Sequence, residues 1–339
     1  MNKLAIVLLL IFTTGTVQGQ LGGQSTYQFL NLVSSPRMAA LGGKNITNYD
    51  YDPTSGLFNP ATINYQMDNQ LSLNYVNYIA DVNYGTASYA YLWDRRTQVI
   101  HGGVTYINYG TFQGFDENGE ATADFSGGEV ALSVGYAANI PNSDFYVGAN
   151  LKLISSKLEQ YSSLGGAVDL GVIYIKEDWN LNIAAVVRNL GTQFTPYDTQ
   201  YEKLPLEVDL GFSQLVPNVP IRWHLTLENL QEWNIAFANP TRGTTDLNGE
   251  TTPEDIGFFQ NLTRRTIIGA ELFPEGGFNI RLGYNFRRAE ELRIEDQRSF
   301  AGLSAGFSLK INKLRFSYAY ARYNSAATSS FFGLNIDLQ

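Results

Sequence analysis

Apolar and polar residues alternate with a period of two in segments that recur through most of the chain. In residues 145–154 the apolar positions are Phe145, Val147, Ala149, Leu151 and Leu153, and the residues between them are polar, small or tyrosine. Segments 204–213, 221–228 and 278–287 repeat the pattern. Successive side chains of a strand point to opposite sides, so this alternation indicates strands that separate an apolar environment from a polar one.

Fourteen segments of this type start near residues 70, 84, 97, 128, 144, 162, 178, 203, 220, 263, 277, 299, 313 and 329. Their connections alternate between tight turns, such as 141–144 and 311–313, and mostly longer segments, such as 109–127 and 230–262. A soluble β-sandwich also has short alternating strands, but segments of about ten residues suit a tilted membrane strand. The pattern favours an all-β protein, a 14-stranded antiparallel transmembrane β-barrel of a bacterial outer membrane.

The composition narrows the class of protein further. The first nineteen residues carry Lys3, an apolar run and small residues, which predicts a secretory signal peptide at 1–19. No later segment has the roughly 18 consecutive apolar residues that a membrane helix needs. Cysteine is absent, which removes disulfides and thiolate chemistry. The net charge of -9 argues against nucleic acid as a partner.

A hydrolase motif in the chain conflicts with this pattern. Residues 302–306 read GLSAG, the G-x-S-x-G pattern of a serine nucleophile, and residues 101–104 read HGGV, which resembles an oxyanion segment. However, no helical pattern follows Ser304, and both histidines precede it, whereas hydrolases of that fold place the histidine after the serine. Alternation instead places Leu303 towards lipid and Ser304 towards the lumen, so we expect no enzyme activity.

Other polar motifs are weak signals of chemistry. DENG at 116–119 and DLNGE at 246–250 lack the spacing of a calcium loop, and Asn-Gly turns account for them better. A set of polar residues on predicted strands forms either a polar site or a mutually paired barrel interior: Glu207, Asp209, Arg222, His224, Glu228 and Arg281. We predict no metal, no cofactor and no small-molecule substrate.

Residues 20–68 do not alternate and precede the first strand. This segment is too apolar for a free tail, and the lumen of a fourteen-stranded barrel is wide enough to hold it. We therefore expect a lumenal plug at 20–68, held partly by Arg37 and by the turn at Asn59–Pro60, and a barrel at 69–339.

Three stretches of the N-terminal segment carry a family resemblance: YQFLNL at 27–32, SPRMAALGG at 35–43 and FNPA at 58–61. They resemble the PorV and PorQ proteins of the type IX secretion system in Bacteroidetes, and YQFLNL is most similar to PorQ. VRNLG at 187–191 and LPLEVDLGFS at 204–213 also resemble these proteins and the wider FadL-like transporters. The resemblance implies a FadL-like barrel with a lumenal plug that carries the family motif as Asn59, Pro60 and Ala61.

The resemblance also implies a non-enzymatic component of type IX secretion that tethers a PorZ-like surface protein of the attachment complex. The alternative is a FadL-like transporter of hydrophobic solutes, for which the mostly polar lumenal positions are a poor lining. Exposed aromatic residues outside a membrane often mark an interface. We therefore predict a partner-binding loop at 230–262 that includes Trp233, Phe237, Phe258 and Phe259.

Overall fold

The computed structural model describes residues 25–79, 81–94, 98–116, 118–233, 244–245, 251–252, 256–292, 300–323 and 328–339. The predicted signal peptide lies outside the described residues. Fourteen antiparallel strands form one closed barrel, in which β1 pairs with β2 on one side and with β16 on the other. The predicted fold class is confirmed, and closure excludes a two-sheet sandwich.

The barrel strands are β1 (Gln70–Asn77), β2 (Asn83–Asp94), β3 (Gln98–Phe112), β4 (Phe125–Asn139), β5 (Phe145–Leu158), β6 (Tyr161–Lys176), β7 (Leu181–Thr195), β8 (Glu207–Leu215), β9 (Ile221–Leu227), β12 (Thr266–Leu272), β13 (Phe278–Asn285), β14 (Leu303–Ile311), β15 (Leu314–Ala321) and β16 (Ser329–Asp337). A separate two-stranded ladder joins β10 (Thr244–Thr245) to β11 (Thr251–Thr252). The helical elements are η1 (Gln28–Asn31), α2 (Pro36–Ala40), η2 (Pro53–Leu57), η3 (Pro60–Thr62), η4 (Tyr65–Met67), η5 (Glu177–Trp179), α3 (Phe258–Arg264) and α4 (Phe286–Glu291).

The outer surface of the wall is apolar. Outward-facing side chains at the middle of the strands remain exposed, with Leu132, Val134 and Leu151 at 53%, 62% and 65%. A water-soluble protein does not leave such a continuous apolar band uncovered, but a membrane barrel presents one to lipid. None of the helices in the described part of the chain is long and apolar enough to span a bilayer.

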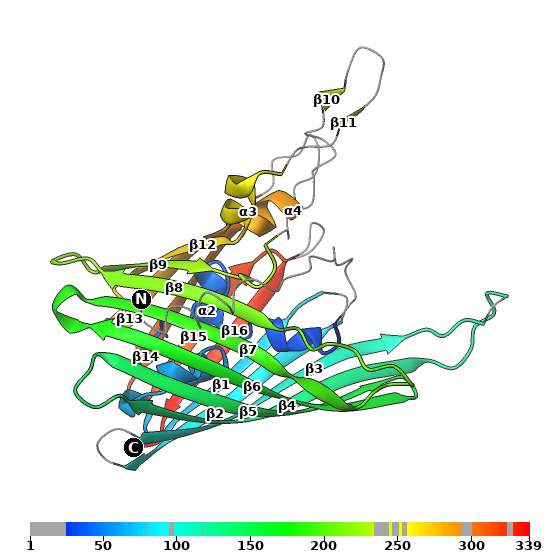
Figure 1. The fold of residues 1–339 in the computed structure, drawn as a ribbon, viewed down its shortest axis with the longest axis horizontal. Coiled ribbons are helices and arrows are strands. Elements are labelled where there is room, and N and C mark those ends of the chain that lie inside the picture. The colour runs from blue at the N-terminus through cyan, green and yellow to red at the C-terminus, as the bar shows by residue number, and fades with distance from the viewer. Residues whose placement is uncertain are drawn as a thin grey trace, which may run out of the picture.

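The two ends of the barrel differ. The short-turn end carries tight connections such as 216–220 and 312–313, whereas the long-loop end carries the β3–β4, β7–β8, β9–β12 and β13–β14 connections. At the long-loop end, β3 to β7 form a taller wall, because they have 14 to 16 residues, whereas β8, β9 and β12 to β16 have 7 to 9. Figure 1 shows β3 and β4 reaching past the other strands. These five strands are longer than the sequence predicted.

Several predicted boundaries are wrong: the strands predicted from 128, 178, 263 and 299 begin at 125, 181, 266 and 303, and residues 263–264 belong to α3. Three further differences have a clear local cause. The strand predicted from residue 203 begins at Glu207, because Pro205 has no N–H to donate and Leu204 is buried. Residues 189–195, predicted as loop, continue β7 after a bulge. Phe286 and Arg287, predicted as strand, begin α4, where the Asn285 side chain caps the helix by accepting from the Arg288 N–H at 3.0 Å.

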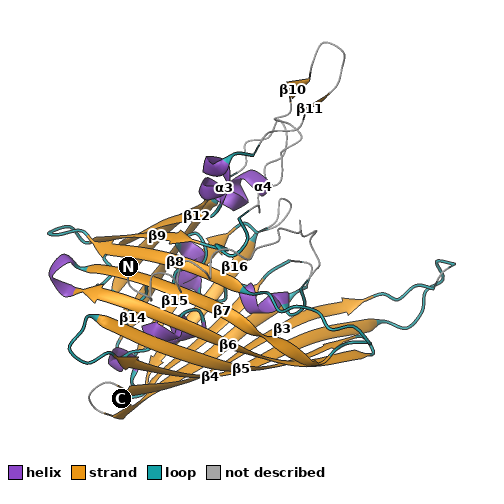
Figure 2. Ribbon diagram, in the orientation of Figure 1, coloured by secondary structure: helices purple, strands orange, loops and turns teal. Residues whose placement is uncertain are grey.

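The N-terminal segment fills the lumen as a series of short helical turns, visible inside the strands in Figure 2. Most of its side chains between Thr26 and Asn64 are buried. The α2 helix packs against β13 to β16, η2 against β1 to β3, and η3 against β4 to β6. Apolar side chains of the plug, including Phe29 and Leu57, share one core cluster with Val76, Ile107 and Phe331 of the wall.

Candidate functional site

A buried carboxylate ties the plug to the wall. Glu271 on β12 accepts hydrogen bonds from Arg37 of α2 through both of its oxygens, at 2.9 Å each, and from Nε of Arg281 on β13 at 2.7 Å. The ring of His224 on β9 lies 3.1 Å from the same carboxylate. All four side chains are at most 4% exposed. Three strands and the plug therefore meet at Glu271, a residue that the sequence analysis did not single out.

Arg37 has a second acidic partner inside the plug, because it also donates to the Asp50 carboxylate. Burial alone would raise the pKa of Asp50, but the charge of the adjacent Arg37 outweighs burial and holds that pKa below its ordinary value. Asp50 is therefore ionised at neutral pH, and Arg37 is held between two acids. Arg37 anchors the plug, as the sequence predicted.

The Asn59–Pro60–Ala61 motif lies buried where the plug presses on β5 and β6. Asn59 accepts from the Ala61 N–H at 3.0 Å and donates to the carbonyl oxygen of Ile46 at 2.8 Å, so it caps η3 and fixes a second plug segment. A Cβ at Gly171 would lie 2.0 Å from Asn59 Oδ1, and one at Gly148 would lie 2.4 Å from the Pro60 carbonyl. Glycine in the wall thus lets the motif approach the strand backbone.

The six polar residues that the sequence placed on strands are drawn into ion pairs. Glu207 pairs with Lys44 of the plug and with Arg188, while Arg188 also lies 3.6 Å from Asp209. Arg281 and His224 contact Glu271, Arg222 lies 3.9 Å from it, and Glu228 lies 3.9 Å from Arg287. Of the two interpretations, the arrangement matches the mutually paired interior.

A repeated local contact joins neighbouring strands at two places, on the side of the short turns that leads to the long-loop end. Asn189 and Asn229 adopt positive φ, and their backbone N–H groups donate to Asp169 at 2.9 Å and to Asp209 at 3.0 Å, respectively. Both acids sit in a Val-Asp-Leu-Gly sequence, forty residues apart. The same acid–asparagine contact therefore accompanies a bulge within β7 and follows the end of β9, and Glu228 and Asn229 line the cavity at the mouth of the barrel.

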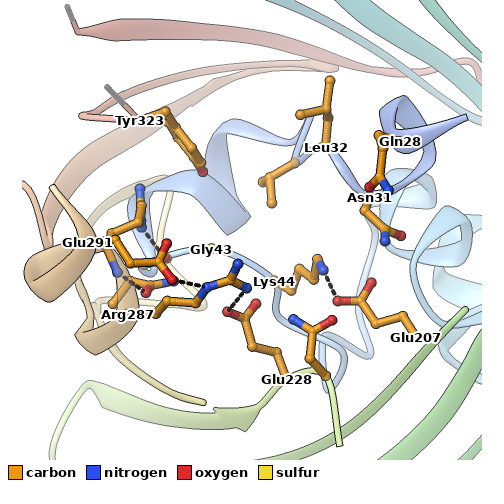
Figure 3. A pocket seen from close by; sticks show the side chains of 15 residues that line it. Gln28, Asn31, Leu32, Gly43, Lys44, Glu207, Glu228, Arg287, Glu291 and Tyr323 are labelled. Atoms are coloured by element: carbon orange, nitrogen blue, oxygen red, sulfur yellow. Dashed lines mark hydrogen bonds and ion pairs between the residues drawn. The ribbon is translucent and has the colours of Figure 1, made fainter. Parts of the chain in front are cut away.

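A cavity of about 410 Å³, with both charged and apolar residues in its lining, lies at this mouth between the plug and the rim. We call it the mouth pocket; it is lined by Gln28, Asn31, Leu32, Val33, Gly42, Gly43, Lys44, Glu207, Glu228, Asn229, Asn285, Arg287, Arg288, Glu291 and Tyr323. Figure 3 shows Lys44 directed at Glu207, and Arg287 between Glu228 and Glu291. Its lining is charged and amide-rich, which does not suit an acyl chain.

Beside the pocket, the β9–β12 connection carries an exposed aromatic cluster. The rings of Trp233 and Phe258 stack with centroids 4.8 Å apart, and Phe259 meets Phe258 edge to face at 5.6 Å. The guanidinium of Arg265 lies 5.2 Å from the Trp233 ring. Phe258 and Phe259 are 59% and 78% exposed. Phe237, the fourth residue predicted for this surface, lies outside the described residues.

The serine of the GLSAG motif is part of the wall. Ser304 is 3% exposed, and its hydroxyl donates to the Ala40 carbonyl of the plug at 3.1 Å, whereas Leu303 is 46% exposed on the outer face. His101 of the HGGV motif lies in β3 and contacts the Pro53 carbonyl at 2.8 Å. The predicted inward and outward positions of 303 and 304 are therefore confirmed, and the two motifs do not form one site.

These observations define the class of protein: a transmembrane β-barrel of the outer-membrane type, whose lumen is filled by its own N-terminal segment. No protein-family model matches the chain, and no curated protein matches its sequence.

Among solved structures, the chain is similar to a FadL homologue of Pseudomonas aeruginosa, with 10% identity, a TM-score of 0.49, and coverage of 90% of this chain and 98% of that chain. It is similar to the KdgM porin, with 7% identity, a TM-score of 0.32 and coverage of 80% and 99%. It is also similar to CdiB from Acinetobacter baumannii, with 9% identity, a TM-score of 0.32 and coverage of 79% and 59%. At such low scores the likeness adds nothing beyond the barrel architecture already described.

Proposed function

We propose that the chain is a non-enzymatic outer-membrane component of type IX secretion, similar to PorQ, that tethers a PorZ-like surface protein through its long-loop end. The observation that carries this proposal is the exposed aromatic cluster of Trp233, Phe258 and Phe259. Stacked aromatic rings outside the membrane, held beside an arginine, have the composition of a protein interface centre. The N-terminal stretches that resemble PorQ supply the particular system.

The packed lumen supports a tether over a transporter. Hydrogen bonds between Arg37 and Glu271 join the plug to the wall. The helical elements of the plug pack against β1 to β6 and β13 to β16. A hydrophobic solute would need an apolar pocket and a path, whereas the mouth pocket presents charged side chains. The mouth pocket therefore does not support the alternative of FadL-like transport.

The proposal is tested by purifying the protein from its own outer membrane and identifying the surface proteins that accompany it. Phe259→Ser removes the most exposed ring of the cluster without opening a core, so the barrel should fold normally while the surface protein is lost. Phe115→Ser is the matched control, because Phe115 is 61% exposed on the β3–β4 connection, outside the cluster. Undiminished recovery of the surface protein with Phe259→Ser would contradict the proposed interface.

A further inference from the structure

One cation of the mouth pocket, Arg288, has no acidic partner among the described residues. The three carboxylates of the lining are each matched: Glu207 by Lys44 and Arg188, and both Glu228 and Glu291 by Arg287. Arg288, the next residue along α4, forms no ion pair within the described part of the chain. It is 91% buried, since its exposed fraction is 9%. A buried guanidinium without a counter-ion is costly, which indicates that an anion is missing.

The surroundings of Arg288 hold it in one position. Its guanidinium stacks over the Tyr323 ring with 4.4 Å to the centroid, and its Nη2 donates to the Gly42 carbonyl of the plug. Nε and Nη1 of Arg288 and the hydroxyl of Tyr323 have no hydrogen-bond partner among the described residues. Two cationic donor atoms and one hydroxyl, all on residues that line the same cavity, are thus left for a ligand.

We propose that the mouth pocket binds a carboxylate group, with Arg288 as its counter-ion and the Tyr323 hydroxyl as a further hydrogen-bond donor. Arginine pairs with planar carboxylates through charge-assisted hydrogen bonds, and its stacking on Tyr323 fixes its plane before the ligand arrives. The amides of Gln28, Asn31 and Asn229 around the cavity suit a polar group rather than an alkyl chain. The ligand is therefore the carboxylate of an acidic side chain or of a small organic acid.

The position of the pocket connects it to the aromatic cluster. The α4 helix, which carries Arg288, packs against α3, which carries Phe258 and Phe259. The strand that follows α3 returns to the pocket, where Arg265 donates to the backbone carbonyls of Glu228 and Asn229. A surface protein seated on the aromatic rings therefore has the pocket within its footprint. Assigning the carboxylate to that protein rests on the proposed function, whereas carboxylate binding itself does not.

The direct test is calorimetric titration of the purified full-length barrel with glutamate blocked by acetyl and amide groups. Blocked glutamine and inorganic phosphate are the comparison probes. We expect blocked glutamate to bind and blocked glutamine to bind about tenfold more weakly or not at all, because a hydrogen bond to a charged group is stronger than one to a neutral amide. Equal binding of the two probes, or binding of phosphate alone, would overturn the proposal.

Three variants test whether blocked glutamate binds at Arg288 and Tyr323. Arg288→Gln should weaken blocked glutamate by about tenfold or more, and Tyr323→Phe, which deletes only the hydroxyl, should weaken it less. Lys157→Gln removes the same charge from an exposed position of β5 outside the pocket and should leave the affinity unchanged. Because Arg288 also contacts the plug, its variant could fail to fold; in that case an unchanged affinity in Tyr323→Phe is the result that refutes the site.

Competition then separates the two sources of the carboxylate. If saturating blocked glutamate releases the co-purified surface protein, the natural carboxylate belongs to that protein. If blocked glutamate binds without releasing it, the pocket takes a free organic acid. If no surface protein co-purifies at all, the proposed tether fails while the titration still decides whether the pocket binds a carboxylate.

Discussion

The two faces of the barrel wall are formed by alternate residues of the same strands, and they differ in what they contact. On β14, Phe307 is 45% exposed on the outer face, while Ser308 beside it is fully buried and donates to Asn279 at 2.6 Å. The inner face contacts the plug through hydrogen bonds, ion pairs and close backbone approaches. The outer face presents exposed apolar side chains to lipid. Changes on the inner face therefore act through specific contacts, whereas changes on the outer face act through transfer into the bilayer.

The largest effect is expected from removing the inner partner altogether. Deleting residues 22–60 takes away η1, α2, η2 and the first residue of η3 while leaving all fourteen strands. Ion conductance in planar bilayers should rise well above that of the intact protein, because the interior of the wall is polar and would admit water. Equal conductance in the two proteins would mean that the plug does not close the pore.

Removing the carboxylate of Glu271 on the inner face should have the next largest effect, a loss of stability. Among the described residues, Glu271→Gln leaves Arg281 without an acid and Arg37 with only Asp50, at a cost on the order of 3–5 kcal/mol, because an uncompensated charge remains buried. Chemical unfolding in detergent, followed by the heat-modifiable gel shift, measures the loss. Asp144→Asn is the control: its pair with Lys176 is exposed, so its loss should cost less than about 1 kcal/mol. Similar costs for both variants would refute the anchoring role of Glu271.

A charge on the outer face should have a comparable but smaller effect. Phe307→Lys near the middle of β14 should cost about 2–4 kcal/mol, as a lysine near the bilayer midplane does. Ser308→Ala, one residue away on the inner face, loses one hydrogen bond and should cost about 1 kcal/mol. The same unfolding assay, run in lipid vesicles, compares the two. A well-tolerated lysine at 307 would be inconsistent with a lipid-facing wall.

The smallest effect comes from adding a single methyl group to either face. Gly148→Ala would place a carbon 2.4 Å from the Pro60 carbonyl and should cost about 1–3 kcal/mol by forcing the plug away. Gly102→Ala on β3 meets nothing within 4 Å and should change the free energy of unfolding by no more than about 0.5 kcal/mol. Indistinguishable unfolding curves for the two variants would show that the plug does not press on β5.

Alternation in the sequence was sufficient to predict the number, order and facing of the strands, because each strand lies between lipid and a polar interior. It located the starts of β1, β5, β13 and β16 to within one residue. It failed where local chemistry overrides the period of two. Asn189 in the left-handed conformation shifts the faces of β7, and the Asn285 cap turns an apparently continuous strand into α4.

The sequence predicted less of the candidate sites than of the fold. Arg37 could be expected to hold the plug, but its partner Glu271 is 234 residues away, and nothing in the chain marks which distant charges meet. Trp233, Phe258 and Phe259 stood out as aromatic residues in a long connection, and their roles remain predictions. Arg288 gave no signal in the sequence, because its importance comes from the lack of an acidic partner among the residues that the structure describes.

The seam between β1 and β16 has a consequence for how the molecule is assembled. The plug precedes β1 in the chain, so it emerges before any strand of the wall, yet it is enclosed only when the final strand pairs with the first. Until that moment both seam strands expose unpaired backbone groups, which a membrane interior does not tolerate. The pairing of β16 with β1 therefore removes the last exposed strand edges and encloses the lumen on all sides.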